Sequence, residues 1–311
     1  MRLAEEAALH WGGRPVALIV ERENAVYRMA VPGGGGGGVA ALRLHRMGYQ
    51  TAAAIRSELW FCGALADAGL PVPRPLLAGD QALVTLSNGR FASAVEWLGG
   101  APLGAAGVPL AGSVARQAEQ HFALGQMLAR VHTATESLTL PDHFARPAWD
   151  VDGLTGDAPF WGRFWEHPAL TDAEAGVMRD ARGFLRTALQ DHARTAPLMP
   201  VHADVLRENI LVDGSDLSLI DFDDCGMGFA LYDLGTVLSQ NLYEPGVADL
   251  RAGLIAGYGS LRGVEARMVD VFTLARTLAS VGWTMPRLAA DDPIMRSHIA
   301  RAVMCARAVM E

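Results

Sequence analysis

The sequence predicts an α+β protein with two lobes, a small lobe rich in strands followed by a larger lobe made mainly of helices. The chain has 311 residues, half of them apolar, which is enough to build two lobes with their own cores. Five strand-like segments and one helix precede the glycine pair Gly99-Gly100, and long helical patterns follow it. We therefore expect one lobe over residues 1–98 and the other over residues 99–311.

The elements of the first lobe are marked by β-prone runs and by residues typical of helix ends. Thr51 is a good N-cap for a helix over 52–68, which Gly69 ends and three prolines follow. The run Gly33–Gly38 is predicted to be a turn, because no Gly-Lys-Ser/Thr follows it and no helix opens after it. The five strands of the expected antiparallel sheet are Val16–Val20, Ala25–Val31, Val39–His45, Ala82–Leu86 and Phe91–Trp97.

The second lobe contains long segments with helical periodicity. Amphipathic helices are expected at Ala118–His132, Val264–Trp283 and Ile294–Met310. The segment 142–169 is rich in tryptophan, phenylalanine and proline, and it is predicted to be an ordered insertion.

Composition and charge narrow the classes of partner. A net charge of −8, from 26 basic and 34 acidic residues, argues against a surface for nucleic acid or another polyanion. The first residues are acidic, unlike a signal peptide, and no segment reaches the roughly 18 apolar residues of a membrane span. The three cysteines lack metal-binding spacing, which is typical of reduced thiols. We expect a cytoplasmic protein without a membrane partner, and the sequence does not indicate its oligomeric state.

The stretch from His202 to Asp223 carries the most functional information. Asp213-Gly214 is a turn signal between two β-prone runs, so Ile210–Ile220 is predicted to form a hairpin. A fold about Ser215 would place Asn209 opposite Asp221, with the two residues roughly 5 Å apart on one face. An amide oxygen and a carboxylate with open coordination positions suit Mg²⁺, which completes its shell with phosphates and water. Asp204, on the loop that enters the hairpin, could accept a proton from an attacking hydroxyl.

The pattern His202-x-Asp204-x-x-x-x-Asn209, followed by Ile220-Asp221-Phe222-Asp223, resembles the aminoglycoside phosphotransferase and choline kinase superfamily. The resemblance implies a bilobal protein-kinase-like fold, with ATP and Mg²⁺ as cofactors and a small-molecule hydroxyl as acceptor. It implies that Asp204 is the catalytic base, that Asn209 and Asp221 hold the metal, and that His202 and Asp223 are supporting residues.

The chain departs from this pattern where the family has a lysine on the third strand. Arg43 stands at that position, flanked by Leu42 and Leu44 on the opposite face, and the whole chain contains no lysine. Glu58 on the following helix is its expected partner. Arginine keeps the positive charge and can hold phosphate oxygens through two N–H groups, although its guanidinium is larger and planar.

Three further residues are predicted to contact the nucleotide. Asn24 lies in the first hairpin, which is expected to cover the phosphates. Glu96 and Leu98 lie at the end of the fifth strand, next to the glycine pair that is expected to form the hinge between the lobes. The main chain of this segment would face adenine.

The acceptor is left open by the sequence. Amino alcohols, aminoglycosides and hydroxy amino acids all fit, and so does a protein Ser/Thr substrate, as in the bacterial stress-response kinase of the same superfamily. Two alternatives to an active kinase were a pseudokinase, which binds nucleotide without turnover, and a metallohydrolase built from His202, Asp204, Asp221 and Asp223.

Overall fold

The computed structural model describes residues 2–21, 24–32, 38–289 and 292–311, and the chain divides into two compact units. Residues 22–23 of the first hairpin and Gly33–Gly37 of the glycine run lie outside the described residues. The first unit comprises Met1–Ala101, Ser137–Arg146 and Leu211–Asp223. The second comprises Pro102–Glu136, Pro147–Ile210 and Asp224–Glu311. The main part of the first unit thus ends within three residues of the predicted lobe boundary, and two later segments join it.

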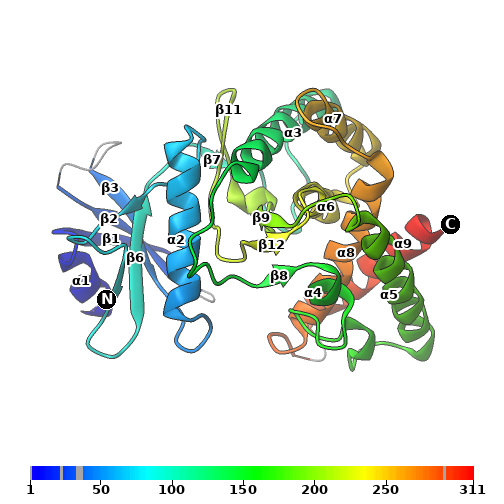
Figure 1. Cartoon of the computed structure of the whole chain (residues 1–311), viewed down its shortest axis with the longest axis horizontal. Helices are drawn as coiled ribbons and strands as arrows, with labels where there is room; N and C mark the ends of the chain where they lie inside the picture. The colour runs from blue at the N-terminus through cyan, green and yellow to red at the C-terminus, as the bar shows by residue number, and fades with distance from the viewer. Residues whose placement is uncertain (1, 22–23, 33–37, 290–291) are drawn as a thin grey trace. The chain divides into compact units, whose positions relative to one another are not determined.

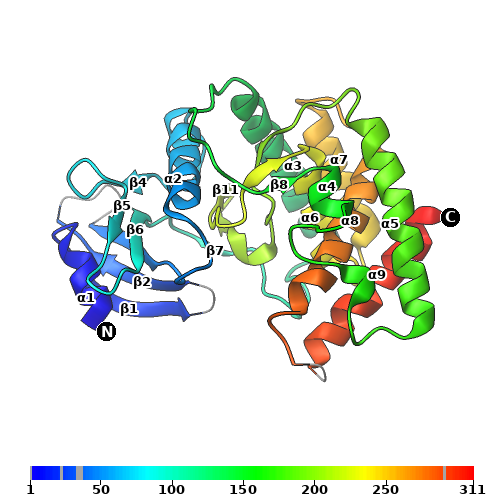
Figure 2. The same cartoon turned by 60° about the horizontal axis from the view of Figure 1, so that its bottom comes forward.

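The first unit is built on a six-stranded antiparallel sheet. Its order is β1-β2-β3-β6-β4, and β5 also pairs with β6 (Figures 1 and 2). The strands are β1 (Arg14–Glu21), β2 (Ala25–Ala30), β3 (Val39–Leu44), β4 (Pro75–Leu76), β5 (Leu83–Thr85) and β6 (Phe91–Glu96). Five of them correspond to the predicted strands, and the two-residue β4 is an addition.

Each face of this sheet packs against one helix. The helix α2 (Ala52–Asp67) begins at Thr51, whose hydroxyl accepts a hydrogen bond from Ala54 N–H at 3.1 Å, as the sequence predicts. On its side of the sheet, Ile55 and Leu59 pack against Leu83. The helix α1 (Arg2–Leu9) was not predicted, and it buries three alanines against the opposite face. Alternation along β3 therefore directs Leu42 and Leu44 toward α1 and leaves Arg43 on the side of α2.

The hairpin predicted after Asn209 is present. It consists of β10 (Ile210–Asp213) and β11 (Asp216–Leu219), and Gly214 in the turn has a φ of +62°. Together with β7 (Ala101–Pro102), these strands form a three-stranded sheet in the order β11-β10-β7.

The second unit consists mainly of helices, with one small sheet. Its helices are α3 (Val114–Glu136), α4 (Val151–Thr155), α5 (Asp172–His192), α6 (Leu231–Asn241), α7 (Val247–Gly259), α8 (Ala266–Thr284) and α9 (Pro293–Met310). The helices α3, α8 and α9 correspond to the three predicted ones. In this sheet, β12 (Gly226–Gly228) runs parallel to β8 (Ala148–Trp149) and antiparallel to β9 (Met199–Val201). No described helix is long and apolar enough to span a membrane.

Small residues allow α3 and α7 to pack backbone to backbone (Figure 1). A Cβ atom at Gly257 would lie 1.9 Å from the carbonyl oxygen of Phe122, and one at Gly125 would lie 2.2 Å from that of Leu254. Real Cβ contacts are never that short, so any larger residue would push the helices apart. This pair supports the active site, because α3 carries His132 and α7 carries Tyr258.

Candidate active site

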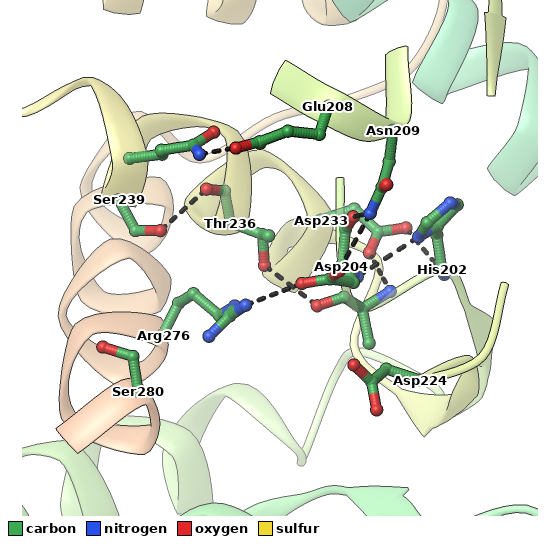
Figure 3. A network of polar contacts seen from close by, with 12 residues as sticks. His202, Asp204, Glu208, Asn209, Asp224, Asp233, Thr236, Ser239, Arg276 and Ser280 are labelled. Carbon is green, nitrogen blue, oxygen red and sulfur yellow. Dashed lines mark hydrogen bonds and ion pairs between the residues drawn. The ribbon is translucent and has the colours of Figure 1, made fainter. Parts of the chain in front are cut away.

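The loop that carries Asp204 is held by the buried carboxylate of Asp233, in the first turn of α6. Asp233 Oδ1 accepts the Ala203 N–H at 2.7 Å, and Oδ2 accepts the His202 N–H at 3.1 Å. Oδ2 also lies 3.0 Å from His132 Nε2, and His132 Nδ1 lies 3.0 Å from the Tyr258 hydroxyl. Figure 3 shows Asp233 next to His202 and Asp204 of this loop. These contacts give Asp233 a structural role.

The same loop has an unusual backbone conformation just before Asp204. Ala203 has a φ of +65°, a left-handed conformation that costs an alanine about 1–2 kcal/mol. His202 is fully buried, and its Nδ1 accepts the N–H of Asp204 at 3.2 Å. Because the ring serves the backbone in this way, the geometry supports a structural role for His202, as the family resemblance implies.

Asn209 is oriented by Asp204 so that its amide oxygen stays available. The Nδ2 of Asn209 donates to the carbonyl oxygen and to Oδ2 of Asp204, both at 2.9 Å (Figure 3). Within the described part of the chain, no donor reaches the amide oxygen. An amide oxygen held in this way fits a Mg²⁺ ligand.

The second group of predicted residues surrounds Arg43 in the first unit. Its Nη1 donates to Glu58 Oε1 at 2.7 Å, and its Nη2 donates to Asp221 Oδ1 at 2.8 Å. Oδ1 of Asp223 lies 3.6 Å from Arg43 Nη1. Burial lowers the pKa of Arg43, but these three carboxylates outweigh it and raise the pKa above its ordinary value. Arg43 is therefore a permanent cation that links β3, α2 and the segment after β11.

Asp221 has the properties of an accessible ligand. Its side chain is 49% exposed, and among the described residues only Arg43 contacts its carboxylate, at Oδ1. Its backbone φ of +63° is uncommon for a residue other than glycine, although aspartate tolerates it better than most. The second carboxylate oxygen is therefore open for a cation.

Asp223 is instead surrounded by donors. Its oxygens accept from Asn24 Nδ2 and from Gln50 Nε2, both at 3.1 Å. Burial and then the charge of Glu58 raise the pKa of this carboxyl above its ordinary value. Arg146 donates to the carbonyl oxygen of Asp223. These contacts support a structural role for Asp223, and they place Asn24 beside the Arg43 cluster.

The two residues of the expected hinge differ in their free backbone groups. The N–H of Glu96 donates to the Arg74 carbonyl oxygen at 2.8 Å, so only its carbonyl could face adenine. Leu98 follows the end of β6, and neither its N–H nor its C=O has a hydrogen-bond partner in the residues that the structure describes. Leu98 is thus the better placed of the two to bind a base.

The predicted site residues fall in both units. His202, Asp204 and Asn209 belong to the second unit, and the Arg43 cluster with Asp221 belongs to the first. The convergence of Asn209 and Asp221 on one metal therefore stays a prediction. In the described ranges, no three His, Cys, Asp or Glu side chains are grouped so as to hold a metal ion, as the metallohydrolase alternative would require.

Comparison with known proteins identifies the family. The model of the phosphotransferase enzyme family matches residues 19–269, which include every predicted site residue. The chain belongs to this family. The family resemblance seen in the motif from His202 to Asp223 is therefore confirmed, and so is the prediction of an enzyme that transfers phosphoryl groups.

Several curated relatives of this phosphotransferase are homoserine kinases. The chain is 27% identical to one from a Chelativorans species over 243 residues, which cover 75% of this chain and 69% of that protein. It is 30% identical to one from Methylobacterium radiotolerans over 233 residues, which cover 72% and 65%. The chain thus spans about two thirds of the length of these relatives.

Solved structures confirm the protein-kinase-like fold. A microcompartment-associated aminopropanol kinase superposes with a TM-score of 0.79 at 26% identity, over 99% of this chain and 94% of that one. An aminoglycoside phosphotransferase in complex with ADP and hygromycin B superposes with a TM-score of 0.63 at 16% identity, over 95% and 92%, and shows the shared fold alone.

Sequence reasoning missed two arginines that contact the site residues of this phosphotransferase. Arg276 of α8 donates to Asp204 Oδ1 at 2.7 Å, and Arg146 contacts Gln50 as well as Asp223. Both contacts join segments that are far apart in the chain. The only signal in the sequence was that every basic residue is an arginine, which does not single out either position.

Proposed function

We propose that this phosphotransferase moves the γ-phosphoryl group of ATP to a hydroxyl group of a small molecule. The observation that carries the proposal is the loop pinned by Asp233. It presents the Asp204 carboxylate, and it holds Asn209 with the amide oxygen available. Family membership supports a role for this loop as the catalytic loop of a kinase, and two proteins similar to this chain are named as kinases.

Each residue has a separate part in this proposal. Asp204 orients the acceptor hydroxyl and takes its proton. Asn209 and Asp221 would hold Mg²⁺, which neutralises charge on the phosphates when it is bound. Arg43 would contact phosphate oxygens while Glu58 fixes its position. Most of the acceleration then comes from positioning and from electrostatic stabilisation of the transferred group.

The acceptor is a hydroxyl compound of the kind used by the relatives. Homoserine is a hydroxy amino acid and aminopropanol is an amino alcohol, and both fit the sequence expectation. The test is an ATP-consumption screen across amino alcohols, aminoglycosides, hydroxy amino acids and a generic protein acceptor, with phosphorylated product identified by mass. Acceptor-dependent ADP formation with Mg²⁺ supports the proposal. Phosphorylation of the protein acceptor alone would replace it with a protein kinase, and nucleotide binding without any transfer would indicate a pseudokinase.

Arg43 decides how the nucleotide is held. Its two donors engage Glu58 and Asp221 at the same time, which the single ammonium of lysine does less well. We expect Arg43→Ala to raise the KM for ATP by about 10-fold or more, because a charge-assisted hydrogen bond contributes about 1.5–3 kcal/mol. Arg43→Lys should keep part of the affinity. An alanine variant with the ATP kinetics of the wild type would remove Arg43 from the site.

A further inference from the structure

A buried arginine lies directly beside the proposed catalytic base. Arg276 of α8 is 6% exposed, and its Nη2 donates to Asp204 Oδ1 at 2.7 Å. The guanidinium also lies over the Trp161 ring, 4.6 Å from the ring centroid. Figure 3 shows its side chain directed from α8 toward Asp204. A cation at this position would meet any acceptor whose hydroxyl reaches Asp204.

Several donors around Arg276 have no hydrogen-bond partner in the described part of the chain. Arg276 Nε is buried without one, and so are the Tyr232 hydroxyl and Trp161 Nε1. These groups belong to one cluster, because Trp149 stacks on Tyr232 at 5.3 Å and meets Trp161 edge-on at 4.8 Å. An unpaired buried donor costs about 1–3 kcal/mol, so a cluster of them indicates a ligand rich in acceptor oxygens.

A second arginine adds positive charge near this cluster. Arg301 of α9 contacts Ser280, one turn beyond Arg276 on α8, at 3.5 Å. Arg301 also contacts His298 Nδ1 at 3.1 Å, and burial lowers the pKa of His298 to about 3, so that the ring is neutral. No carboxylate forms an ion pair with Arg301 in the described residues. Arg301 thus adds a second positive charge close enough to Arg276 for the two guanidinium groups to repel each other.

We propose, on the basis of the function proposed above, that Arg276 binds a carboxylate of the acceptor, so that the preferred substrate is a hydroxy acid or hydroxy amino acid rather than a simple amino alcohol. A planar guanidinium matches a carboxylate through paired hydrogen bonds, and Trp161 holds the guanidinium plane in place. Arg301, which contacts Ser280 on the next turn of α8, adds a second positive charge.

The alternative role for Arg276 is to position Asp204 only. In that case its loss would slow the transfer to every acceptor by the same factor. A carboxylate-binding role predicts a selective loss. The measured quantity is therefore a ratio between two acceptors that differ only in the carboxylate.

The experiment uses the pairs homoserine with its decarboxylated counterpart aminopropanol, and serine with ethanolamine. For the full-length wild type we expect kcat/KM to favour the carboxylate member of at least one pair by about 100-fold, the selectivity that a buried charge-assisted contact provides. Arg276→Gln should reduce this ratio to within about 3-fold of unity, mainly through the KM of the carboxylate member. Arg301→Gln should reduce it partly, and Arg307→Gln, on the exposed face of α9, should leave it unchanged.

A binding measurement tests the carboxylate site even in a variant that transfers phosphate too slowly for kinetics. Calorimetric titration with α-aminobutyrate, which is homoserine without its hydroxyl, should show binding to the wild type and at least about 10-fold weaker binding to Arg276→Gln. A wild type that prefers the amino alcohols, or an Arg276→Gln variant that keeps the wild-type ratio, would overturn the inference and leave the proposed kinase activity standing. If no acceptor is phosphorylated, the proposed function fails, and equal binding of α-aminobutyrate by both proteins would then refute the carboxylate site on its own.

Discussion

Replacing Asp233 tests whether one carboxylate holds the catalytic loop. Asp233→Ala removes the acceptor for two buried backbone N–H groups, those of His202 and Ala203, and for the ring of His132. Each orphaned donor costs about 1–3 kcal/mol. The first two therefore suggest a loss of about 2–6 kcal/mol in the free energy of unfolding of the second unit. Asp233→Asn keeps one acceptor oxygen and should lose about half as much.

The assay is urea unfolding followed by tryptophan fluorescence, since Trp149, Trp161, Trp165 and Trp283 all belong to the second unit. Asp180→Ala, on the exposed side of α5, is the control and should change the free energy of unfolding by less than about 0.5 kcal/mol. Activity should fall together with stability in the Asp233 variants, because Ala203 needs the anchor to keep its left-handed conformation. An Asp233→Ala protein within about 1 kcal/mol of the wild type would refute this account of the loop.

Two further predictions concern packing and pH. Gly257→Ala should lower the free energy of unfolding by about 2–3 kcal/mol, because its Cβ would meet the Phe122 carbonyl oxygen. The control is Gly183→Ala at an exposed position of α5, which should raise the free energy of unfolding by about 0.5–1 kcal/mol. Equal effects of the two substitutions in chemical denaturation would contradict the close packing of α3 and α7. The pKa of His298 is about 3 when folded and near 6.5 when unfolded, so only the unfolded state takes up this proton as the pH falls below about 6.5. Stability should therefore decline from pH 6.5 toward pH 3, and His298→Gln should show a smaller decline in Tm between pH 7 and pH 5; an identical decline would place the titration elsewhere.

The parts of the fold that the sequence could predict are those with local signals. Thr51 marks the start of α2 through its own cap, and Asp213-Gly214 marks the turn of the β10–β11 hairpin. Alternation along β3 was sufficient to place Arg43 on the face of the sheet opposite Leu42 and Leu44, where it forms an ion pair with Glu58 at 2.7 Å. The helix α1 was missed because a run of eight residues is too short to be a stable helix by itself, and it is stabilised by burial against the sheet.

The parts of the site that escaped prediction depend on packing between distant segments. Arg276 meets Asp204 across 72 positions, and the contact requires the register of α8 against the loop, which no local pattern encodes. The same holds for the bond between Arg146 and Gln50, which spans 96 positions. Glu96 shows a different limit, because its position at the end of β6 was predicted, but the partner of its N–H, the Arg74 carbonyl oxygen, could not be read from the sequence.

The central claim is that Asp204 is the base of a phosphoryl transfer, and single-turnover kinetics of Asp204→Asn test it most directly. The wild type and the variant are compared with ATP, Mg²⁺ and an acceptor found in the screen, and nucleotide affinity is measured alongside. Because general base catalysis contributes about 100-fold to 10,000-fold, we expect the rate of product formation to fall by that factor while the affinity for ATP stays within about 3-fold. A variant that transfers the phosphoryl group at nearly the wild-type rate would contradict the assignment.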